Sequence, residues 1–238
     1  MEVQEGENKF MIKVSAEELL ERGAHFGHQS KRWNPKMEEY LYGEEGGVHV
    51  FDLIKTKKLL EEALEFLKTS TKEGKVILFV GCKKQAQEKT REVAEATGSS
   101  YFTERWLGGT LTNFDQMRKS IKKLADMKAG VASGEYNSYT KKERLLIDRE
   151  IARLERYFGG ISKLEKTPDV LVVVDTHKES SAIREANSKG VKVVGIVDSN
   201  ADPTVITYPI PMNDDASKAI EYVLDLMKEV ILEGKKSK

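Results

Sequence analysis

One set of side chains in this 238-residue chain has the composition of a site for a divalent cation. His25 and His28 lie three residues apart, and three aspartates follow far downstream, at Asp198, Asp214 and Asp215. Imidazole nitrogens and carboxylate oxygens are ligands for Zn²⁺, and carboxylates also bind Mg²⁺. If His28 folds back onto a sheet edge, it can join the three aspartates around one Zn²⁺ or Mg²⁺ ion. The alternative is that these carboxylates form helix caps and turns, and no cofactor is required in either case.

Phosphate binding is a second candidate chemistry. Lys83 and Lys84 follow an apolar run that ends at Gly81, where a strand is expected to lead into a helix, and helix N-termini bind anions. The chain has neither G-x-x-x-x-G-K-[ST] nor G-x-G-x-x-G. We therefore predict that Lys83 and Lys84 contact RNA phosphate; the alternative is a solvated first helical turn.

The sequence predicts no catalytic residues. Cys82 is the one cysteine; it has no evident His-Asp partner, and G-x-S-x-G is absent. A nucleotide-binding α/β hydrolase that uses Asp175 and Asp198 is the alternative, but it would need the phosphate loop that the chain lacks. A single cysteine excludes an internal disulfide and is typical of the reducing cytoplasm.

Two segments combine tryptophan with cations, as in surfaces that grip phosphate and stack on rings. Lys31, Arg32 and Lys36 surround Trp33, and Arg105 precedes Trp106. We predict that these four cations contact RNA. Both tryptophans lie beside expected turns, so we predict that they pack against the sheet or against the base of a helical hairpin.

Continuous apolar runs alternate with helical segments and predict an α/β fold with a doubly wound parallel sheet of about five strands. The expected strands are residues 48–53, 76–80, 101–102, 170–174 and 192–197. The expected helices are residues 56–72, 84–96, 179–189 and 217–232, with a short helix after Ser15.

The segment between the third and fourth strands has a different period. Apolar residues from Phe114 to Leu124 and from Ile147 to Ile161 recur every three or four positions, which favours an antiparallel coiled-coil hairpin over two helices packed on the sheet. Cations lie between these positions, and the alternative to RNA contact is a solvated face. The cations that we predict to contact RNA are Arg118, Lys119, Lys122, Lys123, Lys141, Lys142 and Arg144.

The expected organisation is an α/β domain in two parts, with the hairpin inserted between them. Its divisions are a flexible extension (residues 1–14), the first part of the domain (15–110), the hairpin (111–160), the second part (161–234) and a basic tail (235–238).

Charge limits the class of partner. Lys plus Arg and Asp plus Glu both number 39, so the formal net charge is zero and any RNA contact must be local. Residues 105–145 carry nine Lys or Arg against four Asp or Glu. The acidic, polar start is unlike a signal peptide, and no apolar run approaches the roughly 18 residues of a membrane span.

Several uncommon strings occur together and in order. They are His25-Phe26-Gly27-His28-Gln29 with Trp33-Asn34-Pro35-Lys36-Met37, then Arg105-Trp106-Leu107-Gly108-Gly109 with Leu111-Thr112-Asn113, then Pro168-Asp169, Val197-Asp198-Ser199-Asn200, Asp202-Pro203, Pro209-Ile210-Pro211 and Asn213-Asp214-Asp215. From about Ser15 to Gly234 the chain resembles the family of small-subunit ribosomal protein number two, in its bacterial and organellar form. Many bacterial relatives carry Met where Thr110 stands and have longer C-terminal tails, which leaves contacts made by the tail open.

The resemblance implies a flavodoxin-like sheet with an inserted coiled-coil hairpin and no catalysis. It implies a structural constituent of the small (30S) subunit, in the cytoplasm or an organelle matrix, that binds 16S-type ribosomal RNA and neighbouring ribosomal proteins. It also implies that the protein helps to dock the large ribosomal protein number one. Besides the hydrolase, a soluble regulator that clamps a protein partner with the hairpin is an alternative.

Overall fold

The structure is a computed structural model that describes residues 14–237. The predicted flexible extension therefore lies outside the described residues except for Val14, as does Lys238 of the predicted basic tail. Lys235 and Lys236 belong to the last helix instead of forming a separate tail.

Five parallel strands form the central sheet in the order β5-β4-β6-β7-β8. Their bounds are Ile77–Val80 (β4), Ser100–Phe102 (β5), Val170–Val174 (β6), Lys192–Val197 (β7) and Tyr208–Pro211 (β8). Numbered along the chain, this order is 2-1-3-4-5, as in flavodoxin-like sheets. β4 and β6 are buried over their whole length, which explains why their sequences are apolar without alternation. The predicted parallel sheet is confirmed.

One of the five expected strands was placed in the wrong sheet. Val48–Phe51 (β3) is the middle strand of a separate antiparallel sheet, between Phe26–Gln29 (β1) and Leu41–Glu45 (β2). Its residues alternate between half-buried and buried, the pattern of a sheet with one face toward solvent. The fifth parallel strand is β8, which lies at the edge of the sheet, where Pro209 and Pro211 are tolerated although they cannot donate hydrogen bonds.

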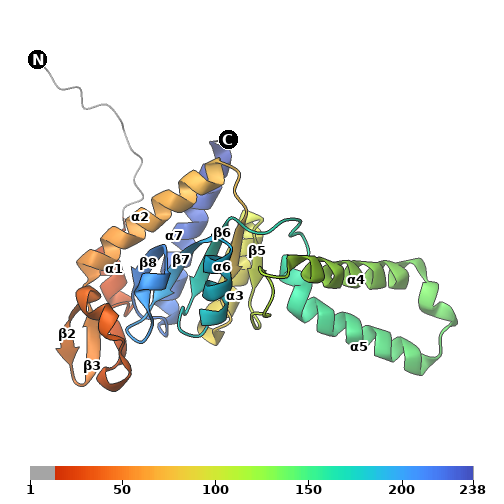
Figure 1. Cartoon of the computed structure of the whole chain (residues 1–238), viewed down its shortest axis with the longest axis horizontal. Helices are drawn as coiled ribbons and strands as arrows, with labels where there is room; N and C mark the ends of the chain where they lie inside the picture. Colours follow the sequence, from red (N-terminus) through yellow and green to blue (C-terminus); the bar gives the residue numbers. More distant parts are fainter. Residues whose placement is uncertain (1–13, 238) are drawn as a thin grey trace, which may run out of the picture.

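Helices cover both faces of the parallel sheet (Figure 1). On one face lie Ala16–Glu21 (α1), Leu53–Lys72 (α2), Lys84–Thr97 (α3) and Ser217–Lys236 (α7). The opposite face is covered by Ser180–Ser188 (α6) and by the base of the inserted helices. The sheet is therefore doubly wound.

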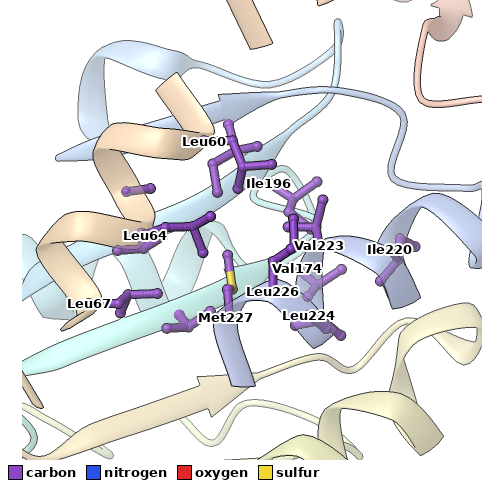
Figure 2. Close-up of a cluster of buried hydrophobic side chains, with 14 of the residues drawn as sticks. Leu60, Leu64, Leu67, Val174, Ile196, Ile220, Val223, Leu224, Leu226 and Met227 are labelled. Atoms are coloured by element: carbon purple, nitrogen blue, oxygen red, sulfur yellow. The ribbon is translucent and has the colours of Figure 1, made fainter. Parts of the chain in front are cut away.

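The largest core cluster lies between α2, α7 and the sheet. Figure 2 shows Leu60, Leu64 and Leu67 of α2 beside α7 side chains that include Val223 and Met227. The three leucines are at most 3% exposed, because the apolar residues of α2 recur every three or four positions on one face. This packing holds the first helix after the small sheet against the last helix of the chain.

The inserted helices, Phe114–Ser133 (α4) and Lys141–Phe158 (α5), leave after β5 and return before β6. Figure 1 shows them side by side and antiparallel, projecting from the sheet; we call residues 114–158 the helical arm. Met117, Leu124, Leu154 and Phe158 are its buried apolar side chains, whereas Leu145 and Leu146 are 49% and 54% exposed. The two helices therefore pack mainly on each other and not flat on the sheet; coiled-coil packing stays a prediction.

The arm returns to the sheet through a close approach of two backbones. A Cβ atom on Gly160 would lie 2.3 Å from the carbonyl oxygen of Tyr101 in β5. Only glycine fits there without moving the strand.

Truncation of Leu67 tests the α2–α7 core. Leu67→Ala removes a fully buried side chain and is expected to lower the free energy of unfolding by about 2 to 5 kcal/mol in urea denaturation. Glu65→Ala, at an exposed position on the same helix, is the matched control and is expected to change it by less than about 0.5 kcal/mol. Equal effects of the two variants would show that this packing does not stabilise the fold.

Candidate functional site

The helical arm carries an excess of positive charge, with eleven Lys or Arg against seven Asp or Glu. Some of its cations are used to join the two helices. Lys123 Nζ lies 2.9 Å from Glu150 Oε1, and Lys128 also forms an ion pair with Glu155. Ion pairing lowers the pKa of the Glu150 carboxyl, mainly through Arg153 and then Lys123. Lys123, which we predicted to contact RNA, thus has an acidic partner on the facing helix.

The other predicted cations of the arm are exposed and form no ion pair within residues 14–237. They are Arg118, Lys119 and Lys122 on α4 and Lys141, Lys142 and Arg144 on α5. Arg118 and Lys122 are four residues apart, and Lys119 and Lys122 are three apart, so neighbouring side chains share a helix face. Arg149 has the same character and was missed by the sequence analysis, since it lies within the apolar repeat of α5.

The base of the arm is held by the carboxylate of Glu185 in α6. Glu185 Oε1 accepts hydrogen bonds from Trp106 Nε1 at 3.0 Å and from Gly109 N at 2.8 Å. Its Oε2 accepts from Leu111 N at 3.0 Å, and from Thr112 N and Oγ1 at 3.1 and 3.0 Å. One side chain therefore binds five donors from the segment 106–112, which leads into α4.

Electrostatics and backbone geometry favour this arrangement. Burial raises the pKa of Glu185, but the hydrogen bonds from Trp106, Gly109, Thr112 and Leu111 outweigh burial and hold the pKa below its usual value. Gly109 has a φ of +91°, which other residues rarely adopt, so the glycine allows its N–H to face the carboxylate.

Trp106 packs inside the protein. It is 6% exposed, and its ring centre lies 5.1 Å from that of Phe102. The expectation that this indole packs at the base of the hairpin is confirmed, and the neighbouring Arg105 stays exposed.

The first basic segment is partly internal as well. Lys31 and Arg32 are exposed, whereas Trp33 is half-buried with its ring centre 4.9 Å from that of His49. Lys36 Nζ lies 2.6 Å from Asp202 Oδ2 and donates to Thr204 Oγ1 at 3.2 Å. Lys36 thereby ties this segment to the loop that follows β7.

The predicted cation-binding residues meet at the carboxyl edge of the sheet. His28 Nδ1 lies 2.9 Å from Asp198 Oδ1, and His28 Nε2 lies 3.8 Å from Asp215 Oδ2. One ligand atom from each of His28, Asp198 and Asp214 lies within 4.8 Å of the other two. Segments about 170 residues apart in the chain are thus brought together as expected, and His28 lies on β1 of the small sheet.

Lys83 is also part of this group, which the sequence analysis did not foresee. Its ammonium lies 2.6 Å from Asp214 Oδ1, 2.6 Å from Asp215 Oδ1 and 3.7 Å from Asp175 Oδ2. The side chain is 14% exposed. Lys83 therefore neutralises carboxylates, whereas its neighbour Lys84 is exposed on the first turn of α3. The contact of Lys83 with RNA phosphate stays a prediction, but its charge is already directed to these carboxylates.

Burial and the close spacing of like charges determine the electrostatics of this group. We call it the ion cluster, and its members are His28, Lys83, Asp175, Asp198, Asp214 and Asp215. Burial raises the pKa of Asp214 to about 7, and the charges of Asp198 and Asp175 add to this effect. The interaction with Asp198 raises the pKa of His28. Burial lowers the pKa of Lys83, but its bonds to Asp214 and Asp215 outweigh burial and raise it.

Cys82 lacks the properties of a nucleophile. Its side chain is 4% exposed, and burial, followed by the charge of Glu179, raises the pKa of the thiol to about 12. The thiolate that would act as nucleophile is therefore scarce at neutral pH.

A profile of the ribosomal protein S2 family matches residues 19–234. The chain belongs to the ribosomal protein S2 family. Several proteins named small ribosomal subunit protein uS2 are similar to it. That of Coprothermobacter proteolyticus is 46% identical over 96% of this chain and 85% of the relative. That of Roseiflexus sp. strain RS-1 is 48% identical over 93% of this chain and 84% of the relative. That of Dictyoglomus thermophilum is 46% identical over 94% of this chain and 92% of the relative.

As a member of the S2 family, the chain is a ribosomal protein and not an enzyme. The hydrolase alternative is thereby set aside. No helix within residues 14–237 is long and apolar enough to cross a membrane.

Replacement of Glu185 by Gln tests the anchor of the arm. The amide keeps one acceptor oxygen and turns an NH₂ group toward donors, so we expect a loss of about 2 kcal/mol in unfolding free energy at pH 7. Amide hydrogens of residues 109–112 should exchange faster. Because the folded pKa of Glu185 is depressed, the stability that it contributes is present above the unfolded pKa and is lost as the pH falls through the folded pKa. The difference between the two proteins should therefore shrink below about pH 4.

Glu88→Gln, at an exposed position on α3, is the matched control and should change neither stability nor exchange. Wild-type stability and wild-type exchange at 109–112 in Glu185→Gln would contradict the anchoring role.

Proposed function

We propose that this protein is a structural constituent of the small ribosomal subunit and binds 16S-type ribosomal RNA through the helical arm. The observation that carries the proposal is the set of six predicted arm cations that are exposed and unpaired within residues 14–237, at Arg118, Lys119, Lys122, Lys141, Lys142 and Arg144. They lie on the projecting pair of helices (Figure 1). Glu185 holds the base of this pair.

The type of residue suits the phosphate backbone of folded RNA. Lys and Arg on a stiff rod can contact phosphates without reading the bases. Four further predicted contacts, Lys31, Arg32, Lys84 and Arg105, are exposed as well and extend the surface to the sheet domain. Lys36, Lys83 and Lys123 also stay predicted contacts, although each already faces a carboxylate. The proposed protein partners are neighbouring ribosomal proteins, among them the large ribosomal protein number one. This part of the proposal depends on the family resemblance alone.

Charge reversal on the arm tests the RNA contact. Lys119→Glu/Lys122→Glu is expected to lower the affinity for small-subunit ribosomal RNA at least about tenfold at fixed salt. It should also reduce the slope of log K against log [salt] by about one for each lysine. We exclude Lys123 from this variant because its reversal would break the ion pair with Glu150.

Lys58→Glu/Lys72→Glu on α2 is the matched control, because it changes the net charge equally at exposed positions outside the arm. The arm variant should bind more weakly than this control. If both double variants show the same affinity and the same salt slope, the arm is not the RNA-binding surface.

We also propose that the ion cluster takes up one divalent cation. His28, Asp198, Asp214 and Asp215 supply one nitrogen and carboxylate oxygens, and the imidazole favours Zn²⁺ over Mg²⁺. The ammonium of Lys83 occupies the oxygens of Asp214 and Asp215, so the cation must displace it. A bound ion would cross-link the small sheet to the edge of the parallel sheet.

Calorimetric titration of the metal-free protein with Zn²⁺ tests this site, and one bound ion per chain is expected. Asp215→Asn, which removes a half-exposed ligand, should weaken binding at least about tenfold. Asp126→Asn, on the exposed part of the arm, should have no effect. Absence of Zn²⁺ binding to the wild type, or equal binding by both variants, would contradict the site.

A further inference from the structure

A cleft of about 530 Å³ lies beside α6, and none of its lining residues belongs to the arm or to the ion cluster. Three segments that are distant in the sequence line it. They are the turn after β6 with the start of α6, the loop after β7, and Asn34 of the first basic segment. The cleft therefore lies at the carboxyl edge of the parallel sheet, where open α/β sheets bind ligands.

The cleft contains buried polar atoms that lack partners. Thr176 is 4% exposed, and its Oγ1 has no hydrogen-bond partner among residues 14–237. Asn200 Oδ1 is also buried and unpartnered within the same range. Unsatisfied buried groups cost stability. Both atoms are closed to solvent, so a ligand that presents donors and acceptors would satisfy them after rotation of the Thr176 and Asn200 side chains.

One cation and one imidazole of the lining are available to an anionic group. Arg184 carries the positive charge, and neither Arg184 nor the exposed His177 forms an ion pair in the part of the chain that the structure describes. Arg184 Nε donates to the carbonyl of Ser180 at 3.3 Å, which holds the guanidinium near the start of α6. Asp202 is the one acidic residue in the lining, and Lys36 and Thr204 already bind its oxygens.

Apolar side chains also line the cleft. Ile183, Ala201 and Val205 are among the lining residues, together with Thr176 and Asn200. A small cleft with apolar side chains, a few polar groups and an arginine is typical of a site for a small anionic ligand with a flat, polar-edged ring.

We propose that this cleft binds one nucleotide, with the base against the apolar lining and the phosphate at Arg184 and His177. Thr176 and Asn200, once their side chains rotate toward the cleft, contact the polar edge of the base. The nucleotide is an unpaired residue of ribosomal RNA. This source rests on the proposed function, which the inference deepens. Such residues can be splayed from a folded RNA, and proteins then bind their bases individually.

The test uses the full chain labelled with ¹⁵N and titrated with AMP, GMP, CMP and UMP, and separately with inorganic phosphate. At least one nucleotide should shift the amide resonances of residues 176–184 and 200–205 in a saturable manner, and more strongly than phosphate. Thr176→Val and Arg184→Ala should each weaken nucleotide binding at least about tenfold. Arg91→Ala, an exposed arginine of α3, is the matched control and should bind as the wild type does.

A second measurement separates this inference from the role of the arm. Thr176→Val changes no charge, so it should lower the affinity for small-subunit ribosomal RNA without changing the salt slope, unlike Lys119→Glu/Lys122→Glu. If no nucleotide shifts these resonances, or if phosphate alone binds as tightly, the nucleotide site is refuted and the RNA contact of the arm is unaffected. If free nucleotides bind but Thr176→Val leaves RNA affinity unchanged, RNA is refuted as the source.

Discussion

The whole arrangement depends on one carboxylate, Glu185, which binds five donors from the segment that enters the arm. Charge-assisted hydrogen bonds are stronger than neutral ones and more directional. A projecting pair of helices has few tertiary contacts, so its direction is set at its two ends. The Glu185 anchor sets one end, and the close approach of Gly160 to Tyr101 sets the other. Together these two contacts allow the arm to project without a covering layer.

Charge is divided between internal and external roles. Lys36, Lys83, Lys123 and Lys128 each face a carboxylate. Exposed cations without such partners in the described chain lie on the arm, in loops and on helices of the sheet domain, and the arm as a whole carries eleven Lys or Arg against seven Asp or Glu. A chain with zero net charge thereby presents a local cationic surface. Because screening limits charge effects to about 8 to 10 Å in physiological salt, the local distribution matters more for RNA than the total.

Sequence periodicity was sufficient for the elements with uniform environments. β4 and β6 are apolar throughout, β7 is apolar after Lys192, and all three were predicted, as were the two helices of the arm. β8 was not predicted because its two prolines are unusual in a strand, and β3 was assigned to the wrong sheet because four residues do not show which sheet a strand joins. For the site, the group of His28 with the aspartates could be predicted, since parallel strands end at one edge. The position of Lys83 could not, because nothing local in the sequence shows whether a lysine at a strand end faces solvent or carboxylates.

The uncommon strings in the sequence mostly serve internal contacts. Trp106 and Gly109 bind Glu185, Asn34 caps the turn that begins at Pro35, and Asp198 accepts hydrogen bonds from Ser199 and Asp214. Each of these contacts requires a particular side chain in a particular backbone conformation. A phosphate contact is less demanding, because a flexible lysine anywhere on a helix face can reach a charged oxygen. The segments that make the chain recognisable are therefore those that build and orient the arm. The residues proposed to bind RNA are lysines and arginines, and their spacing alone differs little from that of an ordinary solvated helix.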